Sequence, residues 1–276
     1  MSGHKVWFIT GAARGFGRLW AEAALARGDK VVATVRNLQT LESLKAQYRE
    51  TLLPLQLDVT DRDAVFKAVN HAHQHFGRLD VVLSNAGYGF MGAIEEAAIE
   101  DIRANFETNV FGTLSVVQAA LPLLRAQGSG HIISVSSLAG VVALPTAGIY
   151  EGTKFAVEGI MEAVAAEVAG LGIKVTIVEP GPYATNFMSD TSIKMAAPNP
   201  VYNPVREQLA AMMTPDMVGN PDATIPAILK LVDANEPPLR LILGTLLPFI
   251  RHVYAERIKT WEAWEDVSKA AQGTVA

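Results

Sequence analysis

Tyr150 and Lys154 are the residues whose types and spacing most directly indicate chemistry. They stand four residues apart in a stretch predicted to be helical over 150–169, so their side chains share one helix face. A phenol beside an ammonium group suits proton transfer, because the positive charge stabilises the tyrosinate and lowers the tyrosine pKa. Carbonyl reduction needs such a proton donor. By spacing alone, however, the pair also fits an ordinary surface helix.

A glycine-rich segment supplies the second chemical feature. TGAARGFG at 10–17 follows an apolar run and precedes a predicted helix over 15–27. Glycine permits close backbone approach, and a helix N-terminus offers N–H groups to a pyrophosphate. After a first strand, this arrangement is typical of a dinucleotide site rather than of a simple tight turn. The loop residues expected to bind the cofactor are Gly11, Arg14, Gly15, Phe16 and Gly17.

The end of the second predicted strand indicates which dinucleotide binds. NAD sites place an acidic residue about 20 positions after the glycine loop, on the ribose 2′-hydroxyl. Here VVATVRN at 31–37 contains no carboxylate, and Arg36 stands in its place. A guanidinium group suits a 2′-phosphate, and Arg14 can approach the same phosphate. The sequence therefore predicts NADP(H), unless both arginines are merely solvated.

Together with these features, further segments make the chain resemble the short-chain dehydrogenase/reductase family from about Lys5 to Thr185. They are LDVT at 57–60, NAG at 85–87, NVFGT around Asn109, SVSSLAG at 134–140, YEGTK at 150–154 and PGPYAT at 180–185. NVFGT, GVVALP and TKFAVEG are similar to hydroxysteroid and retinol dehydrogenase-like members. Glu151-Gly152 after Tyr150 departs from the family pattern and leaves the local surface undefined. The cofactor contacts that the resemblance implies are Asp58, Val59, Asn85, Ala86, Gly87, Tyr150, Lys154, Pro180, Gly181 and Thr185.

The resemblance also implies catalytic roles for Ser137, Tyr150, Lys154 and Asn109. Ser137 would bind the substrate oxygen and stabilise developing negative charge. Lys154 would bond the nicotinamide ribose, and Asn109 would hold a water molecule that links Lys154 to solvent. Lys154 and the oxidised nicotinamide would bring the tyrosine pKa from about 10 to about 7, which needs roughly 4 kcal/mol. Alternatively, Ser137 only forms a turn and Asn109 only caps a helix.

The elements that must position these residues are predicted from alternating patterns. Strands are expected at Val6–Thr10, Val31–Val35, Leu53–Leu57, Val81–Ser84, His131–Val135 and Lys174–Val178. Helices are expected over 15–27, 61–76, 105–126 and 150–169. Nearly continuous apolar strands alternating with helices indicate a parallel sheet. We therefore expect one α/β domain over 1–276, a Rossmann-type doubly wound sheet with helices on both faces and the ligand at the strands' carboxyl ends.

Segments outside this pattern are harder to interpret. Residues 186–222 are rich in Met and Pro and poorly periodic, which favours a substrate lid over a mobile insertion. Met188, Met195, Met212, Met213 and Met217 either line an apolar pocket or belong to the core. Trp261 and Trp264 are expected to anchor the tail by packing. In HAHQH at 71–75, His71 and His75 share a helix face, but a solvated helix end is favoured over a metal site.

Composition excludes several classes of protein. Net charge is −5 and the chain has no cysteine, so a nucleic-acid-binding face, disulfides and thiolate metal sites are not expected. The apolar run 239–250 spans 12 residues, whereas a membrane helix needs roughly 20, and the N-terminus lacks a signal-peptide pattern. We expect a soluble cytoplasmic protein, and the resemblance implies a homodimer or homotetramer, with an interface on 105–126 and 150–169.

Three functions fit these features to different degrees. The first is an NADPH-dependent oxidoreductase that interconverts a carbonyl and an alcohol. The apolar 186–250 region indicates that its substrate is bulky and hydrophobic. The second is a regulatory protein of the same fold that senses NADPH without turnover, which the intact serine–tyrosine–lysine set disfavours. The third is a structural subunit without a dinucleotide, which Arg14 and Arg36 disfavour.

Overall fold

The computed structural model describes residues 4–185, 187, 192–212 and 214–273. Its strands are β1 (Val6–Thr10), β2 (Lys30–Val35), β3 (Leu52–Gln56), β4 (Val81–Ser84), β5 (Gly89–Met91), β6 (Gly130–Val135), β7 (Ile173–Pro180), β8 (Ile193–Met195) and β9 (Arg240–Leu243). Its helices are α1 (Gly15–Ala26), α2 (Glu42–Gln47), α3 (Arg62–Phe76), α4 (Ile99–Phe106), α5 (Gly112–Gln127), α6 (Gly148–Val168), α7 (Asn203–Met212), α8 (Ile225–Asp233), α9 (Leu247–Ala263) and α10 (Glu265–Gln272). Two short turns matter for the site: η3 (Glu107–Phe111), which is π-helical, and η4 (Leu138–Gly140), which is 3₁₀.

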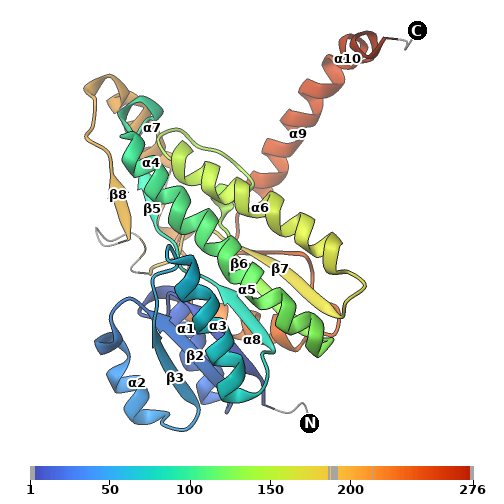
Figure 1. The fold of residues 1–276 in the computed structure, drawn as a ribbon. Coiled ribbons are helices and arrows are strands. Elements are labelled where there is room, and N and C mark those ends of the chain that lie inside the picture. The colour runs from blue at the N-terminus through green and yellow to red at the C-terminus, as the bar shows by residue number, and fades with distance from the viewer. Residues whose placement is uncertain (1–3, 186, 188–191, 213, 274–276) are drawn as a thin grey trace.

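A seven-stranded parallel sheet forms the centre of the molecule (Figure 1). Its strand order is β3-β2-β1-β4-β6-β7-β9, and every neighbouring pair is parallel. The chain moves outward from β1 to β2 and β3, and then continues on the other side of β1 with β4. This reversal is the switch point at which α/β sheets bind ligands. The predicted doubly wound Rossmann-type fold is confirmed.

Helices cover both faces of the sheet, each over its own apolar core. One core combines sheet side chains with α3, α5 and α6, where Val69, Val116 and Met161 are fully buried or nearly so. The other combines the opposite sheet face with α1 and α8, where Trp20 and Ile228 are buried. Strands enclosed on both faces explain why the predicted strands are almost continuously apolar.

The predicted strands and helices begin and end within one or two residues of the observed ones, with two exceptions. The helix predicted over 105–126 is observed but begins earlier, because α4, the π-helical turn η3 and α5 run without a break from Ile99 to Gln127. Strand β9 was not predicted, because it is a short edge strand that begins with a charged residue, Arg240. It lies within the apolar run 239–250, and the last residues of that run form the beginning of α9.

The segment 186–222 is more regular than its sequence suggests. It contains β8, which pairs with β5, and helix α7. Arg206 on α7 pairs with Glu96, which holds this segment against the main body. Met195 and Met212 are exposed, so they are not core residues, and Met217 is half-buried. Met188 and Met213, and the part of the expected lid at 186, 188–191 and 213, lie outside the described residues.

Helices α9 and α10 project away from the body (Figure 1). The expectation that Trp261 and Trp264 anchor the tail by packing is wrong, because they are 69% and 64% exposed. Only the first turns of α9 reach the core, through Ile250 and its neighbours, which pack against Val142. Further along α9, Arg257 donates to the Val141 carbonyl oxygen at 3.4 Å, and most of the later residues are exposed. No helix among the described residues is both long and apolar enough to span a membrane.

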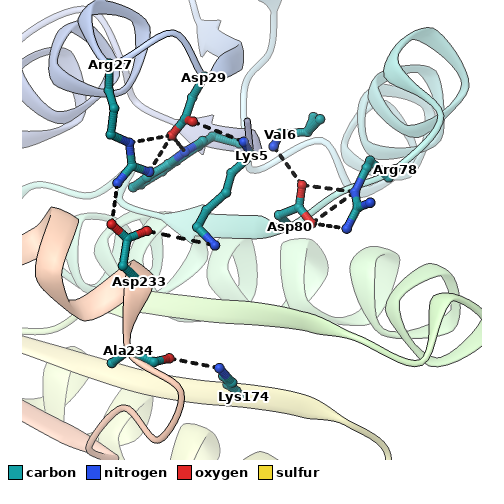
Figure 2. A network of polar contacts seen from close by, with 10 residues as sticks. Lys5, Val6, Arg27, Asp29, Arg78, Asp80, Lys174, Asp233 and Ala234 are labelled. Carbon is teal, nitrogen blue, oxygen red and sulfur yellow. Dashed lines mark hydrogen bonds and ion pairs between the residues drawn. The ribbon is translucent and has the colours of Figure 1, made fainter. Parts of the chain in front are cut away.

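A polar network fixes the amino-terminal end of the central strands (Figure 2). Asp29, in the turn before β2, accepts hydrogen bonds from the Lys5 backbone N–H at 3.0 Å and from the Trp7 indole at 2.8 Å. It also pairs with Arg27, which in turn pairs with Asp233 at the end of α8. Asp29 is 3% exposed, so its carboxylate depends on these donors for solvation.

We expect Asp29→Asn to lower the free energy of unfolding by about 2–3 kcal/mol, because the amide cannot accept from all three donors and leaves buried groups unpaired. Urea denaturation at neutral pH measures the loss. The matched control is Asp233→Asn: this side chain is 46% exposed, and an exposed ion pair contributes less than about 1 kcal/mol. Equal losses in the two variants would contradict this account of Asp29.

Candidate active site

Most of the residues predicted to bind or react lie at one edge of the main sheet. The glycine loop follows β1, Arg36 follows β2, and Asn85–Gly87 follow β4. Ser137 follows β6, and Pro180 ends β7. Because all these strands are parallel, their carboxyl ends meet at the same edge. The fold therefore brings segments far apart in the sequence to one side of the switch point.

The glycine loop is packed so closely that side chains would not fit at two of its positions. A Cβ at Gly17 would lie 2.4 Å from the Asn85 amide nitrogen and 2.5 Å from the Gly11 carbonyl oxygen. A Cβ at Gly11 would lie 2.9 Å from Ala86 Cα. The first turn of α1, Gly15–Arg18, contains no acidic residue. Its N–H groups and positive dipole end suit an anion.

Asn85 locks the glycine loop to β4. Its side-chain nitrogen donates to the carbonyl oxygens of Thr10 at 2.9 Å and Gly11 at 3.2 Å. In return, the Thr10 hydroxyl accepts from the backbone N–H groups of Asn85 at 2.9 Å and Ala86 at 3.0 Å. The Asn85 amide thus positions the loop backbone, a role that the sequence did not indicate.

Arg36 is exposed at the rim of a hollow of about 500 Å³ that follows β2. Lys45 from α2 and Gln56 from β3 line the same hollow, as does the acidic Glu42. The Gln56 side chain donates to the Arg36 carbonyl oxygen at 3.0 Å, which fixes the backbone there. Arg14 is exposed in the glycine loop. The hollow therefore offers at least two cations, of which the sequence indicated Arg36.

Asp58 and Val59 differ in what they can contact. Asp58 is exposed and accepts hydrogen bonds from the Thr60 N–H at 3.0 Å and the Thr60 hydroxyl at 2.9 Å. Val59 is buried, and a Cβ at Gly112 would lie 2.8 Å from its side chain. Val59 therefore packs against the start of α5.

Ser137, Tyr150 and Lys154 come together as predicted. The Ser137 side chain lies beside the Tyr150 hydroxyl and lowers its pKa, and the Lys154 Nζ lies 5.7 Å from the centre of the Tyr150 ring. Ser137 caps η4 by accepting from the Ala139 N–H at 3.1 Å. Lys154 donates to the Val135 carbonyl oxygen at 2.8 Å, which directs its ammonium group toward the end of β6.

Burial is the largest influence on the pKa values of Tyr150 and Lys154. It raises the pKa of Tyr150 to about 12, although the Ser137 hydrogen bond opposes the rise. It lowers the pKa of Lys154 to about 8. The expected tyrosine pKa of about 7 is therefore not produced by the chain's own residues, because desolvation of the phenolate raises the pKa and the Glu151 charge raises it further. At neutral pH the Tyr150 hydroxyl is protonated.

Asn109 sits in the π-helical turn η3, whose extra residue turns its side chain inward. Its oxygen accepts from the Tyr88 N–H at 3.0 Å, and its nitrogen donates to the Tyr88 carbonyl at 2.9 Å and the Thr153 hydroxyl at 3.0 Å. Thr153 then donates to the Tyr150 carbonyl at 2.6 Å. Both Asn109 donors are thus used inside the protein, so any water it holds must donate to its oxygen.

Residues 180–185 run alongside this group. The Gly181 N–H donates to the Leu243 carbonyl at 2.9 Å, which ties the segment to β9. The Thr185 hydroxyl accepts from the Phe187 N–H at 3.2 Å. The Phe187 ring lies 5.8 Å from the Tyr150 ring, centre to centre. An apolar wall therefore stands beside the tyrosine, and it belongs to the segment expected to form a lid.

Glu151 is not a surface residue, although the sequence left the surface after Tyr150 undefined. It is 3% exposed, and its carboxylate accepts from the Leu144 N–H at 2.6 Å. Burial raises its pKa to about 7. It fixes the loop before α6, where Thr146 has a positive φ of 65°. The departure from the family pattern therefore has a structural role.

Several contacts around the candidate site were not identified from the sequence. They involve Thr10, Lys45, Tyr88, Thr153, Glu158, Glu179 and Arg240. The one available signal was the position of Glu158, four residues after Lys154 on the same helix face. His71 and His75 are exposed on α3, and within the described ranges no group of three or more potential ligands could hold a metal.

Comparison with known proteins places this geometry in context. A sequence profile described as short chain dehydrogenase matches residues 5–196. An oxidoreductase of Botryotinia fuckeliana, BOA17, is 40% identical over 244 residues, covering 87% of this chain and 89% of its own. A 3-ketodihydrosphingosine reductase of Bacteroides thetaiotaomicron is 34% identical over 260 residues, covering 93% of both chains.

Solved structures agree with these relatives. The crystal structure of a short-chain dehydrogenase from Streptomyces avermitilis superposes with a TM-score of 0.90. It is 36% identical and covers 98% of this chain and 99% of its own. Structures of the same fold at lower identity include complexes with NAD and with NADP.

Proposed function

This chain belongs to the short-chain dehydrogenase/reductase family, and we propose that it is an NADPH-dependent oxidoreductase that interconverts a carbonyl and a secondary alcohol. The observation that carries the proposal is the buried Tyr150, with the Ser137 side chain beside its hydroxyl and the Lys154 Nζ 5.7 Å from its ring centre. This group lies at the same sheet edge as the glycine loop. A proton donor and a dinucleotide site are thus combined at one edge of the sheet.

The residues present fit a dinucleotide. Gly17 and Gly11 leave room that a Cβ would fill, so the backbone can approach a pyrophosphate closely. We assign the pyrophosphate to the loop 11–17, the adenine to Asp58 and Val59, and the nicotinamide end to Asn85–Gly87, Lys154, Pro180, Gly181 and Thr185. When bound, the cofactor supplies the hydride.

The chain's own side chains supply the proton and orient the substrate. Burial keeps the Tyr150 hydroxyl protonated at neutral pH, so in the reductive direction it can donate its proton to the carbonyl oxygen. Ser137 donates a second hydrogen bond to the same oxygen and stabilises its developing negative charge. The Lys154 ammonium stabilises the tyrosinate that remains.

The preference for NADPH rests on the hollow after β2. Arg36 and Lys45 outnumber Glu42 there, and a guanidinium group can bind a phosphate through two hydrogen bonds. We therefore assign the 2′-phosphate to Arg36, with Arg14 approaching from the glycine loop.

Arg36→Ala should lower kcat/KM for NADPH by about 10–100-fold, because a charge-assisted hydrogen bond contributes about 1.5–3 kcal/mol. The rate with NADH should change little, since NADH has no 2′-phosphate. Initial rates with both cofactors measure the ratio. Arg49→Ala, which removes another exposed arginine near α2, serves as the control. A wild-type preference for NADH would refute the assignment of Arg36 and Arg14.

We further infer a bulky apolar substrate. Phe90, Ile149 and Phe187 pack together beside Tyr150, and Phe187 belongs to 186–222, which we propose as the substrate lid. Rates of NADPH consumption against ketones and aldehydes of increasing size test this inference. Higher kcat/KM for larger apolar ketones supports it, whereas a preference for small polar carbonyls contradicts it.

We also propose a homodimer or homotetramer. Phe111 on η3 and Phe155 on α6 are 51% and 37% exposed, and both lie in the long stretches expected to carry the interface. Burial of such aromatic rings between subunits would remove apolar surface from water.

A further inference from the structure

A buried cluster of carboxylates lies one turn beyond Lys154 on α6. Glu158 on α6 and Glu179 on β7 are 5% and 2% exposed. Arg240, the first residue of β9, places its Nε 3.1 Å from Glu158 and 3.5 Å from Glu179. Its Nη2 donates to the exposed Glu162 at 2.7 Å. One guanidinium group thus joins α6, β7 and β9 and faces two buried carboxylates.

The cluster is short of donors if both carboxylates are ionised. One oxygen of Glu158 and one of Glu179 are buried without a hydrogen-bond partner within the described residues. The Ser136 hydroxyl adjoins Glu158 near Gly140 and can donate to its carboxylate, so the oxygen that still lacks a donor is that of Glu179. An unpaired buried carboxylate oxygen is costly. A proton shared between the two carboxylates would provide the missing hydrogen bond.

The ionisation of the pair agrees with this geometry. Burial, together with repulsion from Glu158, raises the pKa of Glu179 to about 7. Burial also raises the pKa of Glu158. Two carboxylates that face the same guanidinium nitrogen in a desolvated site cannot both ionise easily. Near neutral pH the pair therefore carries about one negative charge rather than two.

Lys154 is the group that this charge affects. Burial lowers its pKa, and the negative charge of Glu158 opposes that change. The titratable or charged side chains on the elements packed around Lys154 are Tyr150, Glu151, Glu158, Glu162 and Glu167 on α6, Glu100, Asp101 and Arg103 on α4, Glu107 on η3, Lys174 and Glu179 on β7, and Arg240 on β9. Among them, Glu158 is the one whose charge acts on Lys154.

We propose that Glu158 and Glu179 share one proton as a carboxyl–carboxylate pair held by Arg240, and that the remaining negative charge keeps Lys154 protonated. Glu158 is then a positioning residue, because it acts on Tyr150 only through the charge of Lys154. Its importance for turnover rests on the proposed function, whereas its effect on Lys154 does not.

The direct test is an NMR titration of the protein labelled with ¹³C-lysine, with the Lys154 signal assigned by its loss in Lys154→Met. Glu158→Gln should lower the Lys154 pKa by up to about 1 unit, because the pair's negative charge then moves onto Glu179, which does not act on Lys154 as Glu158 does. The matched control is Glu162→Gln, which removes an exposed carboxylate from the same helix and the same arginine. It should leave the Lys154 pKa unchanged. An identical Lys154 pKa in Glu158→Gln and wild type would overturn the proposal.

Glu179→Gln provides a second variant if Glu158→Gln folds poorly, which thermal unfolding would reveal. Without Glu179, Glu158 loses its like-charged neighbour and ionises more readily. The Lys154 pKa should therefore stay the same or rise, and a fall would also overturn the proposal.

The pH profile of carbonyl reduction gives a kinetic readout. In wild type, kcat/KM should fall at high pH as the protonated Tyr150–Lys154 pair loses a proton. Removing the negative charge at Glu158 makes that proton easier to lose, so the alkaline limb should move to lower pH by up to about 1 unit. An unmoved limb contradicts the role of Glu158 in turnover. If Glu158→Gln shifts the Lys154 pKa but the protein never turns over a substrate, the proposed function is refuted. The proposal about Glu158, Glu179 and Lys154 then still holds.

Discussion

Tyr150→Phe is expected to lower kcat by about 10²–10⁴-fold, the range that a positioned general acid contributes. The substitution removes only the hydroxyl, which contacts Ser137, and leaves the buried ring in place. The carbonyl oxygen then loses its proton donor while Ser137 and the glycine loop remain. NADPH affinity should stay within about threefold of wild type, because the loss affects the transition state rather than cofactor binding. Stopped-flow rates and fluorescence titration of NADPH measure the two quantities.

Tyr48→Phe is the matched control, since Tyr48 ends α2 on the other side of the sheet. It should keep wild-type kcat. If Tyr150→Phe retained more than about a tenth of wild-type kcat, less than the smallest effect expected of a general acid, Tyr150 would not be the proton donor.

The second large effect is expected from Gly17→Ala. The new Cβ would overlap the Asn85 amide and the Gly11 carbonyl, at 2.4 and 2.5 Å. The Gly11 backbone cannot move without breaking the contacts that Asn85 makes with the loop. Overpacking of this kind costs about 1–3 kcal/mol. If that strain falls on the loop, NADPH affinity drops by about 10–100-fold, which isothermal titration calorimetry measures.

Two other glycines separate crowding from backbone strain. A Cβ at Gly159, on α6, would meet nothing within 4 Å, so Gly159→Ala should leave NADPH affinity unchanged. A Cβ at Gly15 would also meet nothing, but its φ is +57°, so Gly15→Ala tests strain alone, at a cost of about 1–2 kcal/mol. Wild-type affinity in Gly17→Ala would show that the loop does not bind the dinucleotide closely.

The central sheet could be predicted because its strands are buried on both faces and therefore read as apolar runs. Strands β5 and β8 could not, because each has three residues and forms only by pairing with the other, about a hundred positions away. Strand β9 was hidden in the apolar run 239–250, which Gly244 and Pro248 divide between a strand and a helix. Strands that form only by pairing with a segment far away in the sequence leave no local pattern from which they could be predicted.

The helices show a similar limit. The π-helical turn at Glu107–Phe111 interrupts a helical pattern without changing its periodicity visibly, yet it places Asn109 beside Thr153. Trp261 and Trp264 were expected to pack because large aromatic residues usually do. On α9 and at its C-terminal end they are exposed, because the helix leaves the body after its first turns.

For the candidate site, motifs predicted the residues but not their electrostatics. The serine, tyrosine and lysine meet because the strands and α6 lie where expected. The pKa of Tyr150 depends on burial, Ser137 and Glu151, and that of Lys154 depends on burial and Glu158. Glu179 and Arg240 are 21 and 82 residues from Glu158 in the sequence, so their contact could not be inferred from spacing.

The most direct test of hydride transfer uses NADPH that carries deuterium at the reactive carbon of the nicotinamide, with mass spectrometry of the alcohol formed from an apolar ketone. We expect one deuterium on the carbinol carbon with wild type, faster from NADPH than from NADH, and almost none over the same time with Tyr150→Phe. The contradictory result is tight NADPH binding by a folded wild-type protein that transfers no deuterium to any carbonyl in the panel. That outcome would favour a protein that senses NADPH without turnover.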